Sequence, residues 1–498
     1  MTSVVFVGFD SMDCRLVRRW AAEGRLPAFQ QLIDTWSSAP TENLRGLMVG
    51  GLWPSFWSRS HPGMHGSYSW RQLLPNTYLT DMFLPTNFDA EPFWVELDRA
   101  GIRTAVLDMP LVRPTPLQHG IHAVDWGSHD SQLSTSITAG TSASTTVERL
   151  QALGAYPQRQ CDTVVIRHGH ETLVKNIHEG IDLRSKALSI LLDDAPDVLA
   201  TVFAETHCAG HHLYHLHDTA DGRYDADLAA RCGGDALLHV YEHMDRALAE
   251  LLARIPGDAS VMVLLSHGVG PHQDGSLLLP EILRRLADHH RPTPAWRTAR
   301  ARTYARAAGV RRRMQRRLGR RNRVDLKIRN VDGSAPWYPL PNNDLYGAIR
   351  VNLQGREQRG RVRRGSDYEQ VLTLLSDELL ALRHVHSGEA AVRSVLRTDD
   401  LYPGPKRDWL PDLFVEWNWD ESFADLTSPT VGVIAGVDTP IRTGDHRLHG
   451  EVFAHHLPLA ATSPIPVQQL AHLLVDEAYR RRSDTPPGET ISAMRPAQ

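Results

Sequence analysis

Histidine and aspartate side chains recur at positions from which they could share a divalent metal ion. His207 and His211 lie in ETHCAGHHLYH, His267 follows the apolar run VMVLLS, and His446 lies in RTGDHRLHG. Asp10 ends the first apolar run, VVFVGFD. Neutral imidazole is the commonest nitrogen ligand of zinc-like ions, and three protein ligands beside an open position form a catalytic site. One H-x-x-x-H spacing means little among 26 histidines, but the combined set predicts a metal site.

The elements that would position these residues are short apolar runs alternating with amphipathic segments, which is typical of an α/β fold with a largely parallel sheet. Candidate strands are Val4–Gly8, Thr104–Leu107, Val198–Ala204, Val261–Leu265, Ala348–Asn352 and Leu413–Val415. Candidate helices are Cys14–Glu23, Pro27–Trp36, Pro92–Arg99, Gly180–Leu192, Leu237–Arg254, Ser366–Leu382 and Pro466–Glu477. Asp10, the segment Glu205–His211 and the pair Ser266-His267 each follow a candidate strand. Ligands of open α/β sheets bind beyond the carboxyl ends of the strands, so we expect one shared site there.

The overall composition is that of an ordinary globular enzyme. The chain has 498 residues, of which 42% are hydrophobic, and a formal net charge of −4, which argues against a disordered or fibrous protein. Its four cysteines form no CxxC pair, so neither a disulfide framework nor a thiolate zinc site is indicated, and a reduced cytoplasmic compartment is favoured. No signal-peptide pattern and no run of roughly 18 apolar residues is present, so we expect neither secretion nor membrane insertion. The oligomeric state cannot be read from the sequence.

One segment departs from this balanced composition. Arg297–Arg329 is strongly basic, and it falls within an expected insertion at residues 290–335. Basic runs are often nucleic-acid footprints, and they are also typical of solvated helices whose arginines pair with acidic surface. We favour the second interpretation, and we expect the tail at residues 479–498 to be disordered.

Seven segments of the chain occur in an order that is more informative than any single motif. They read GFDSMDCRLVRRWAAEGRLPAFQQL, WPSFWSRSHPGMHG, ETHCAGHHLYH, LLSHGVGPHQDG, GAIRVNLQGREQRGRV, LPDLFVEW and RTGDHRLHGEVFA. Together they resemble the type I phosphodiesterase / nucleotide pyrophosphatase family of the alkaline phosphatase superfamily. The resemblance implies one catalytic domain over residues 1–478, with a largely parallel central sheet and helices on both of its faces. It also implies two-metal transfer of a phosphoryl or sulfuryl group from a small-molecule ester.

The resemblance places metal ligands at six positions, two of which depart from the family pattern. They are Asp10, Ser266 and His267 for the ion on the nucleophile side, and His207, His211 and His446 for the other ion. His207 replaces an aspartate, a change that zinc tolerates. Ser266 also replaces an aspartate, and serine is a poor ligand. We therefore expect one firm ion, zinc in preference to manganese, at the three histidines and a second, weaker ion. Carboxylates that could assist the second ion are Asp13, Glu205, Asp274 and Asp445.

The family's nucleophile position falls on Val49, and valine cannot attack an ester. Ser55 and Ser58 follow about one and two turns further along the presumed helix and are alternative catalytic residues. A third route is direct attack by a metal-activated water or an acceptor hydroxyl, without a covalent intermediate. Gly50 and Gly51 would then offer backbone N–H groups at a helix N-terminus to the anionic substrate. We favour this third route.

A further stretch, WGSHD, resembles a family segment near the active site. It makes Trp126 a candidate substrate contact and His129 a candidate catalytic residue. The favoured function is a metal-dependent hydrolase of a phosphodiester, phosphoanhydride or sulfate ester. A biosynthetic transferase of a phosphoryl or sulfuryl group and a non-catalytic binding protein on the same fold remain alternatives. A nucleic-acid enzyme would require the Arg297–Arg329 segment to bind DNA or RNA.

Overall fold

The computed structural model describes most of the chain as two compact units. The described residues are 2–82, 90–127, 136–140, 143–157, 160–273, 275, 277–290, 329–330, 333–342, 345–419, 423–436, 441–459 and 464–483. Those of the first unit fall within 1–61, 84–272 and 439–498, and those of the second within 62–83 and 273–438. Most of the expected insertion at 290–335, nearly all of Arg297–Arg329 and the tail beyond 483 lie outside the described residues. The single catalytic domain over residues 1–478 stays a prediction.

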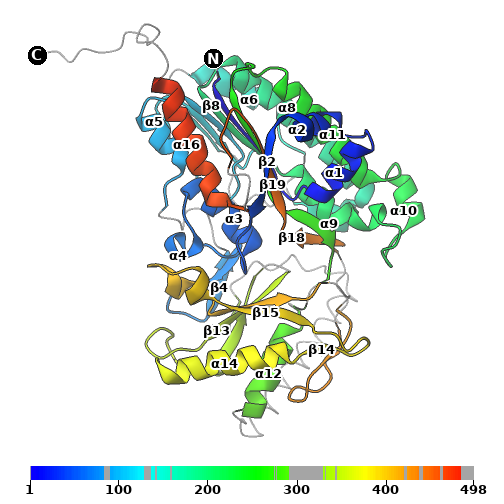
Figure 1. Cartoon of the computed structure of the whole chain (residues 1–498), viewed down its shortest axis with the longest axis vertical. Helices are drawn as coiled ribbons and strands as arrows, with labels where there is room; N and C mark the ends of the chain where they lie inside the picture. The colour runs from blue at the N-terminus through cyan, green and yellow to red at the C-terminus, as the bar shows by residue number, and fades with distance from the viewer. Residues whose placement is uncertain are drawn as a thin grey trace, which may run out of the picture. The chain divides into compact units, whose positions relative to one another are not determined.

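A nine-stranded sheet forms the centre of the first unit (Figure 1). Its strands are, in order across the sheet, β20 (Ile465–Pro466), β2 (Ser37–Glu42), β19 (Gly450–His455), β9 (Ser260–Leu265), β1 (Val4–Phe9), β8 (Val198–Phe203), β5 (Thr104–Leu107), β6 (Ile121–Val124) and β7 (Ser136–Ala139). The five strands from β9 to β6 pair in parallel, whereas β19 and β7 run antiparallel to their neighbours. The expected α/β fold with a largely parallel sheet is therefore confirmed.

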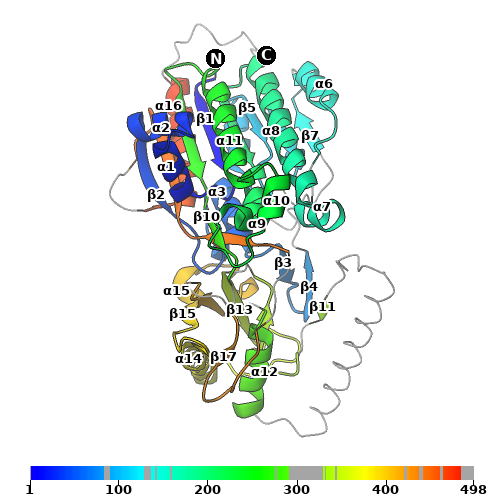
Figure 2. The ribbon, with the colours of Figure 1, turned by 90° about the vertical axis from the view of Figure 1, so that its right-hand side faces the viewer.

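Helices cover both faces of this sheet (Figures 1 and 2). One face carries α3 (Met48–Ser58), α5 (Phe93–Arg99) and α16 (Val467–Ser483). The other carries α1 (Cys14–Ala22), α2 (Pro27–Thr35), α6 (Ser144–Ala152), α8 (His170–Asp193), α9 (Glu205–His217) and α11 (Ala236–Leu252), with the short helices α7 (Cys161–His168) and α10 (Ala226–Arg231) beside them. Because both faces are covered, β1, β8 and β9 are buried along their whole length and consist of nearly continuous apolar runs. None of the described helices is both long and apolar enough to cross a bilayer.

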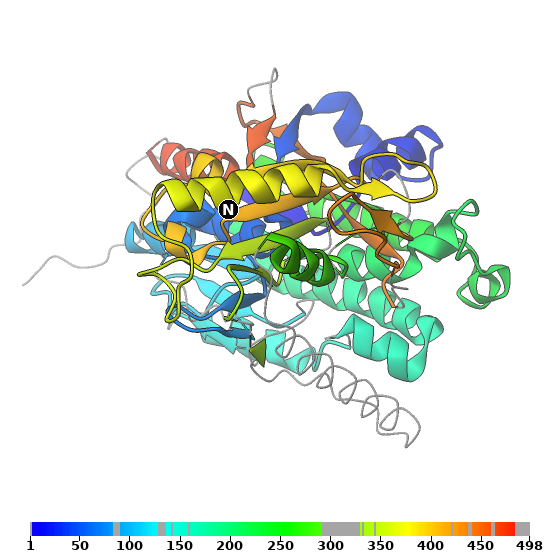
Figure 3. The ribbon, with the colours of Figure 1, turned by 90° about the horizontal axis from the view of Figure 1, so that it is seen from below.

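The second unit contains a four-stranded antiparallel sheet with its own apolar core. The strands are β12 (Trp337–Leu340), β13 (Tyr346–Val351), β16 (Leu413–Trp417) and β15 (Val392–Arg397), and helices α12 (Leu279–His290) and α14 (Ser366–Leu380) pack on the sheet (Figure 3). The strands expected at Ala348–Asn352 and Leu413–Val415 are present, and they belong to this antiparallel sheet and not to the large, largely parallel one. Both are buried throughout, and such uniform burial cannot distinguish antiparallel from parallel strands in a sequence.

Shorter elements complete both units. In the first unit, β10 (Gly268–Pro271) pairs antiparallel with β18 (Gly444–Arg447). The shorter elements of the second unit are α4 (Pro62–His65), β3 (Arg71–Leu73), β4 (Leu79–Met82), β11 (Arg329–Asn330), β14 (Arg383–His384), α15 (Thr398–Leu401), a 3₁₀ helix at Arg407–Trp409 and β17 (Leu426–Thr427).

Candidate metal centre

The carboxyl ends of three neighbouring strands define the position of the site. In the register of the sheet, Phe9 of β1 lies beside Phe203 of β8 and Leu265 of β9, so these strands end at the same level. Asp10 and Ser266 are the next residues after β1 and β9, and helix α9 begins two residues after β8 ends. Residues separated by more than 250 positions in the sequence thereby reach one edge of the sheet.

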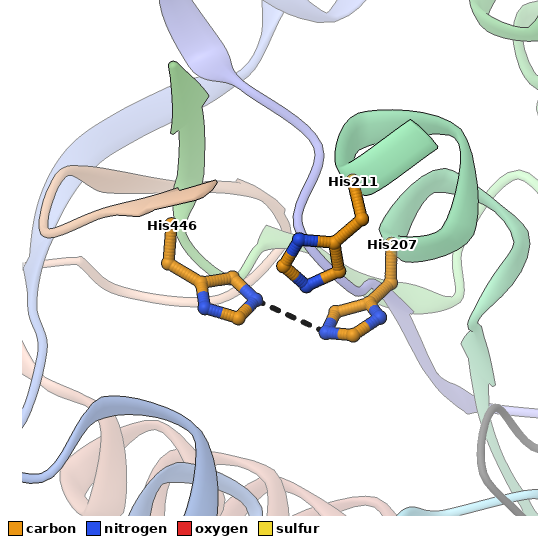
Figure 4. A group of neighbouring side chains, drawn as sticks. All are labelled: His207, His211 and His446. Atoms are coloured by element: carbon orange, nitrogen blue, oxygen red, sulfur yellow. Dashed lines mark hydrogen bonds between the residues drawn. The ribbon is translucent and has the colours of Figure 1, made fainter. Parts of the chain in front are cut away.

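Three histidines converge at this edge from two elements (Figure 4). His207 and His211 lie four residues apart on α9 and therefore share one face of the helix. His446 comes from β18, where it pairs with Val269 of β10, just beyond His267. All three histidines are buried, and one potential ligand nitrogen from each lies within 4.8 Å of the others.

The hydrogen bond of His211 to the backbone leaves its other nitrogen lone pair directed into the cluster. Nδ1 of His211 lies 2.8 Å from the carbonyl oxygen of Gly444. A carbonyl can only accept, so Nδ1 carries the proton and Nε2 carries the lone pair, which is the usual arrangement behind a histidine ligand. Nε2 of His207 and Nε2 of His446 lie 3.0 Å apart. A set of three buried imidazoles with this spacing fits a zinc-like ion.

Burial also keeps His211 in the form that binds metal. The pKa of His211 lies well below its ordinary value, because burial disfavours the imidazolium and the nearby Arg442 and His207 add positive charge. The side chain is therefore neutral at physiological pH, and protons do not compete with a metal ion for its Nε2.

Asp10, Ser266 and His267 form a second, weaker set beside the histidines. Oδ1 of Asp10 accepts hydrogen bonds from Nε1 of Trp53 at 3.1 Å and Oγ of Ser266 at 3.2 Å, and it lies 3.4 Å from Nε2 of His267. Burial raises the pKa of Asp10, but the hydrogen bond and charge of His267 outweigh burial and hold that pKa well below its usual range. The carboxylate is thus ionised, yet one of its oxygens is shared among protein donors. This set fits an ion less well than the three histidines do.

The sequence profile of the type I phosphodiesterase / nucleotide pyrophosphatase family matches residues 4–446. The chain belongs to this family. No curated protein matches the chain in sequence. Phosphonoacetate hydrolase from Sinorhizobium meliloti 1021, solved in complex with phosphonoformate, shares the fold at 14% identity and a TM-score of 0.55, with 96% of each chain covered. Murine ectonucleotide pyrophosphatase / phosphodiesterase 5 is 10% identical over 96% of this chain and 95% of its own, with a TM-score of 0.45. The family match and the fold shared with phosphonoacetate hydrolase make the fold alkaline-phosphatase-like.

Helix α3 contains the segment in which the family resemblance places the nucleophile. The helix begins at Met48, so Val49 and Gly50 lie in its first turn, and the N–H of Gly51 donates to the carbonyl of Leu47 at 3.3 Å. Gly51 therefore uses its N–H within the helix. Oγ of Ser58 donates to the carbonyl oxygen of Pro54 at 2.5 Å, and Ser55 is fully buried.

The other predicted residues have further partners of their own or lie outside the described residues. Trp126 is buried in the core against Tyr156, with its backbone N–H donating to Asp108 at 2.7 Å, and His129 lies outside the described residues. Among the possible assisting carboxylates, Asp13 caps the N-terminus of α1, and Glu205 binds the buried guanidinium of Arg184.

One of the assisting carboxylates, Asp445, lies beside a metal-ligand candidate. One carboxylate oxygen of Asp445 lies 3.6 Å from Nδ1 of His446, and the other lies 3.9 Å from Nδ1 of His272. It is fully buried, and one of its oxygens accepts a hydrogen bond from the backbone N–H of His446 at 2.7 Å. Asp274 lies outside the described residues.

A second cluster of donor atoms lies next to the first. Cys161, Asp162 and His212 bring potential ligand atoms within 4.8 Å of one another. However, Asp162 accepts from Nε and Nη2 of Arg442 at 3.1 and 3.2 Å and lies 3.0 Å from Nε2 of His212. Both oxygens of Asp162 thus already accept hydrogen bonds from the guanidinium, so this cluster is an ion-pair network.

A substitution at Gly444 tests the close contact between β18 and α9. A Cβ at this position would lie 2.0 Å from the carbonyl oxygen of Gly210 and 2.8 Å from Cβ of Tyr214, so the two elements would have to separate. We expect Gly444→Ala to lower the free energy of unfolding by about 1–3 kcal/mol and to weaken metal retention, because His211 and His446 move apart.

The matched control for this variant is Gly257→Ala, since a Cβ there meets no atom within 4 Å. Chemical denaturation and metal analysis of the two variants measure the difference. Equal metal affinity in Gly444→Ala and wild type would show that the contact does not position the histidines.

Proposed function

We propose that this chain is a metal-dependent hydrolase of a small-molecule phosphodiester, phosphoanhydride or sulfate ester. The observation that carries the proposal is the convergence of His207, His211 and His446 in a member of the type I phosphodiesterase / nucleotide pyrophosphatase family. A divalent ion held there would polarise the ester and lower the pKa of a bound water. Zinc suits three imidazole ligands better than manganese does, because manganese favours oxygen ligands.

Residues of the chain itself orient the ligand side chains and set the charge of this site. The carbonyl of Gly444 fixes the ring of His211, and the shared edge of the sheet holds Asp10 next to His267. In this proposal, Asp10, Ser266 and His267 would hold a second, weaker ion, and Asp10 supplies the only carboxylate of that set.

We further propose that hydrolysis proceeds without a covalent intermediate on the protein. The hydroxyl of Ser58 is engaged with the backbone of its own helix, and Ser55 is buried within the helix packing. Direct attack on the ester needs neither of them. No observation favours the transferase or the binding-protein alternative, and a cytoplasmic location stays a prediction from the cysteine content.

The proposed function is tested with purified protein, bis(4-nitrophenyl) phosphate and 4-nitrophenyl sulfate. We expect close to one equivalent of zinc per chain, release of nitrophenol from at least one substrate, loss of turnover with a chelator and recovery with added zinc. A chain that neither contains nor takes up a divalent ion would overturn the proposal. Turnover that survives removal of the ion would do the same.

Ser266 offers a separate test of the weaker set. Ser266→Asp adds a second carboxylate close to Asp10, and at about 4 Å and an effective dielectric of about 20 the two charges repel by about 4 kcal/mol. We expect the variant to have a lower Tm than wild type without metal and to regain stability when zinc or manganese is added. Thermal unfolding with and without metal measures the effect, and Ser266→Asn, which adds similar volume without charge, is the control. A Tm that does not respond to metal would argue against ligation at this position.

A further inference from the structure

Arg442 is the cation closest to the three histidines among the interactions described above. Its Nη1 lies 3.5 Å from Nε2 of His211, the nitrogen that carries the lone pair. The side chain of Arg442 is about one quarter exposed, whereas the histidine beside it is almost fully buried. Arg442 therefore brings a partly exposed cation next to the buried nitrogens.

Asp162 holds this guanidinium in one orientation. Its two oxygens accept from Nε and Nη2 of Arg442, which leaves Nη1 on the side of His211. Burial raises the pKa of Asp162, but the hydrogen bond from His212 and the charge of Arg442 lower it to about 2, so the carboxylate stays ionised. A tethered guanidinium loses less side-chain entropy when it binds an anion than a free one does.

The backbone at Arg442 is also fixed against α9. The N–H of the next residue, Thr443, donates to the carbonyl of His211 at 2.7 Å, and Oγ1 of Thr443 lies 2.8 Å from Nδ1 of His215. The residue that follows Arg442 is thus bound to the helix that carries two of the three histidines. Arg442 and the histidines behave as one positioned group.

The charge balance of the site favours an anionic ligand. Only Asp10 contributes a carboxylate to the predicted ligand positions, since neutral side chains stand at His207 and Ser266. Asp162 balances the guanidinium of Arg442, so an ion at the histidines beside Asp10 would still leave positive charge for an anionic substrate.

We propose that Arg442 binds a second anionic group of the substrate, joined by a short spacer to the ester that the three histidines receive. Asp162 is a positioning residue that acts through Arg442. The substrate class is thus an ester or anhydride with at least two separate anionic groups. This inference rests on the proposed function for the reacting group, and it adds the charge requirement at Arg442.

The experiment compares two probes that differ only in a remote carboxylate, 3-phosphonopropionate and propylphosphonate. Titration calorimetry with the protein as purified, its metal content measured, gives the ratio of their dissociation constants without relying on turnover. We expect wild type to bind 3-phosphonopropionate about tenfold more tightly than propylphosphonate, the order of one charge-assisted contact. In Arg442→Gln the ratio should fall to about one.

Two further variants separate binding from structure. Asp162→Asn should lower the ratio to about threefold while the metal content stays the same. Arg231→Gln is the matched control, because Arg231 lies on α10 and pairs with Glu171 away from the histidines. Its ratio should equal that of wild type.

Each result decides the inference independently of the proposed hydrolase. A wild-type ratio near one, including no binding of either probe, overturns it, and so does an Arg442→Gln variant that keeps the wild-type ratio. Loss of a metal equivalent in Asp162→Asn also overturns it, because Asp162 would then be a metal ligand. Wild type could hydrolyse bis(4-nitrophenyl) phosphate, lose that activity with a chelator, and still give a ratio of one. In that case the proposed function stands and only the charge requirement at Arg442 fails.

Discussion

Replacing His211 by alanine is expected to remove the bound ion and to lower kcat/KM for a nitrophenyl phosphodiester by on the order of 10³-fold or more. His211 has its lone pair fixed by the hydrogen bond to Gly444, and two imidazoles remain once it is lost. Two ligands hold a zinc-like ion far less firmly than three do. The large effect on activity therefore follows from loss of the ion.

Metal analysis after gel filtration and steady-state kinetics measure this effect. His217→Ala is the control on the same helix, because His217 pairs with Asp235 at 2.6 Å and lies outside the three-histidine set. It should retain both the ion and the activity. A His211→Ala protein that is folded by circular dichroism and keeps a full equivalent of zinc would refute the three-histidine site.

The parallel part of the fold could be predicted because its signals are local. Strands β1, β5, β8 and β9 are continuous apolar runs, and the expected boundaries agree with the structure to within a residue. Once these strands are parallel and adjacent, the residues that follow them must meet at one edge. For this reason the sequence could place Asp10, His267 and the start of α9 near one another.

Contacts that depend on side chains from distant elements could not be predicted. Trp53 donates to Asp10 across 43 positions, and Arg442 reaches Asp162 across 280. Neither has a spacing that relates it to a metal ligand. For Arg442 one weak signal existed, since it lies four residues before His446 in the same motif. Trp53 lies in WPSFW, which is more typical of core packing.

The antiparallel part of the fold shows a different limit. The edges of the large sheet and the sheet of the second unit consist of strands whose direction depends on long connections. Uniform burial in β13 and β16 removes the alternation that would have marked antiparallel pairing. Direction is a property of the whole chain path, so local pattern cannot supply it.

Replacing Arg184 by methionine is expected to lower the free energy of unfolding by about 3–5 kcal/mol, because it leaves two buried carboxylates without a cation. The side chain is fully buried, with Nη1 2.8 Å from Asp108 and Nε 2.9 Å from Glu205. Nη2 also donates to the carbonyl oxygen of Gly127 at 2.8 Å. Burial lowers the pKa of Arg184, but the two carboxylates outweigh burial and raise it, so the guanidinium stays charged.

Urea denaturation of Arg184→Met and of Arg254→Met measures this difference. Arg254 pairs with Asp193 at 2.6 Å on the surface, and such pairs contribute about 0–1 kcal/mol. A loss no larger than that of Arg254→Met would contradict the prediction.

Arg184→Met is also expected to weaken zinc binding at the metal centre, through a shift of α9. Glu205 is the first residue of this helix, two positions before His207, and it also accepts a hydrogen bond from Tyr156. Without Arg184 the start of the helix can shift, so the ligand nitrogen of His207 moves relative to those of His211 and His446. We expect zinc affinity to fall in Arg184→Met and to recover in part when Glu205→Gln is added, because the amide needs no counter-charge. Unchanged zinc affinity in a destabilised Arg184→Met protein would show that the ion-pair network stabilises the fold without positioning the histidines.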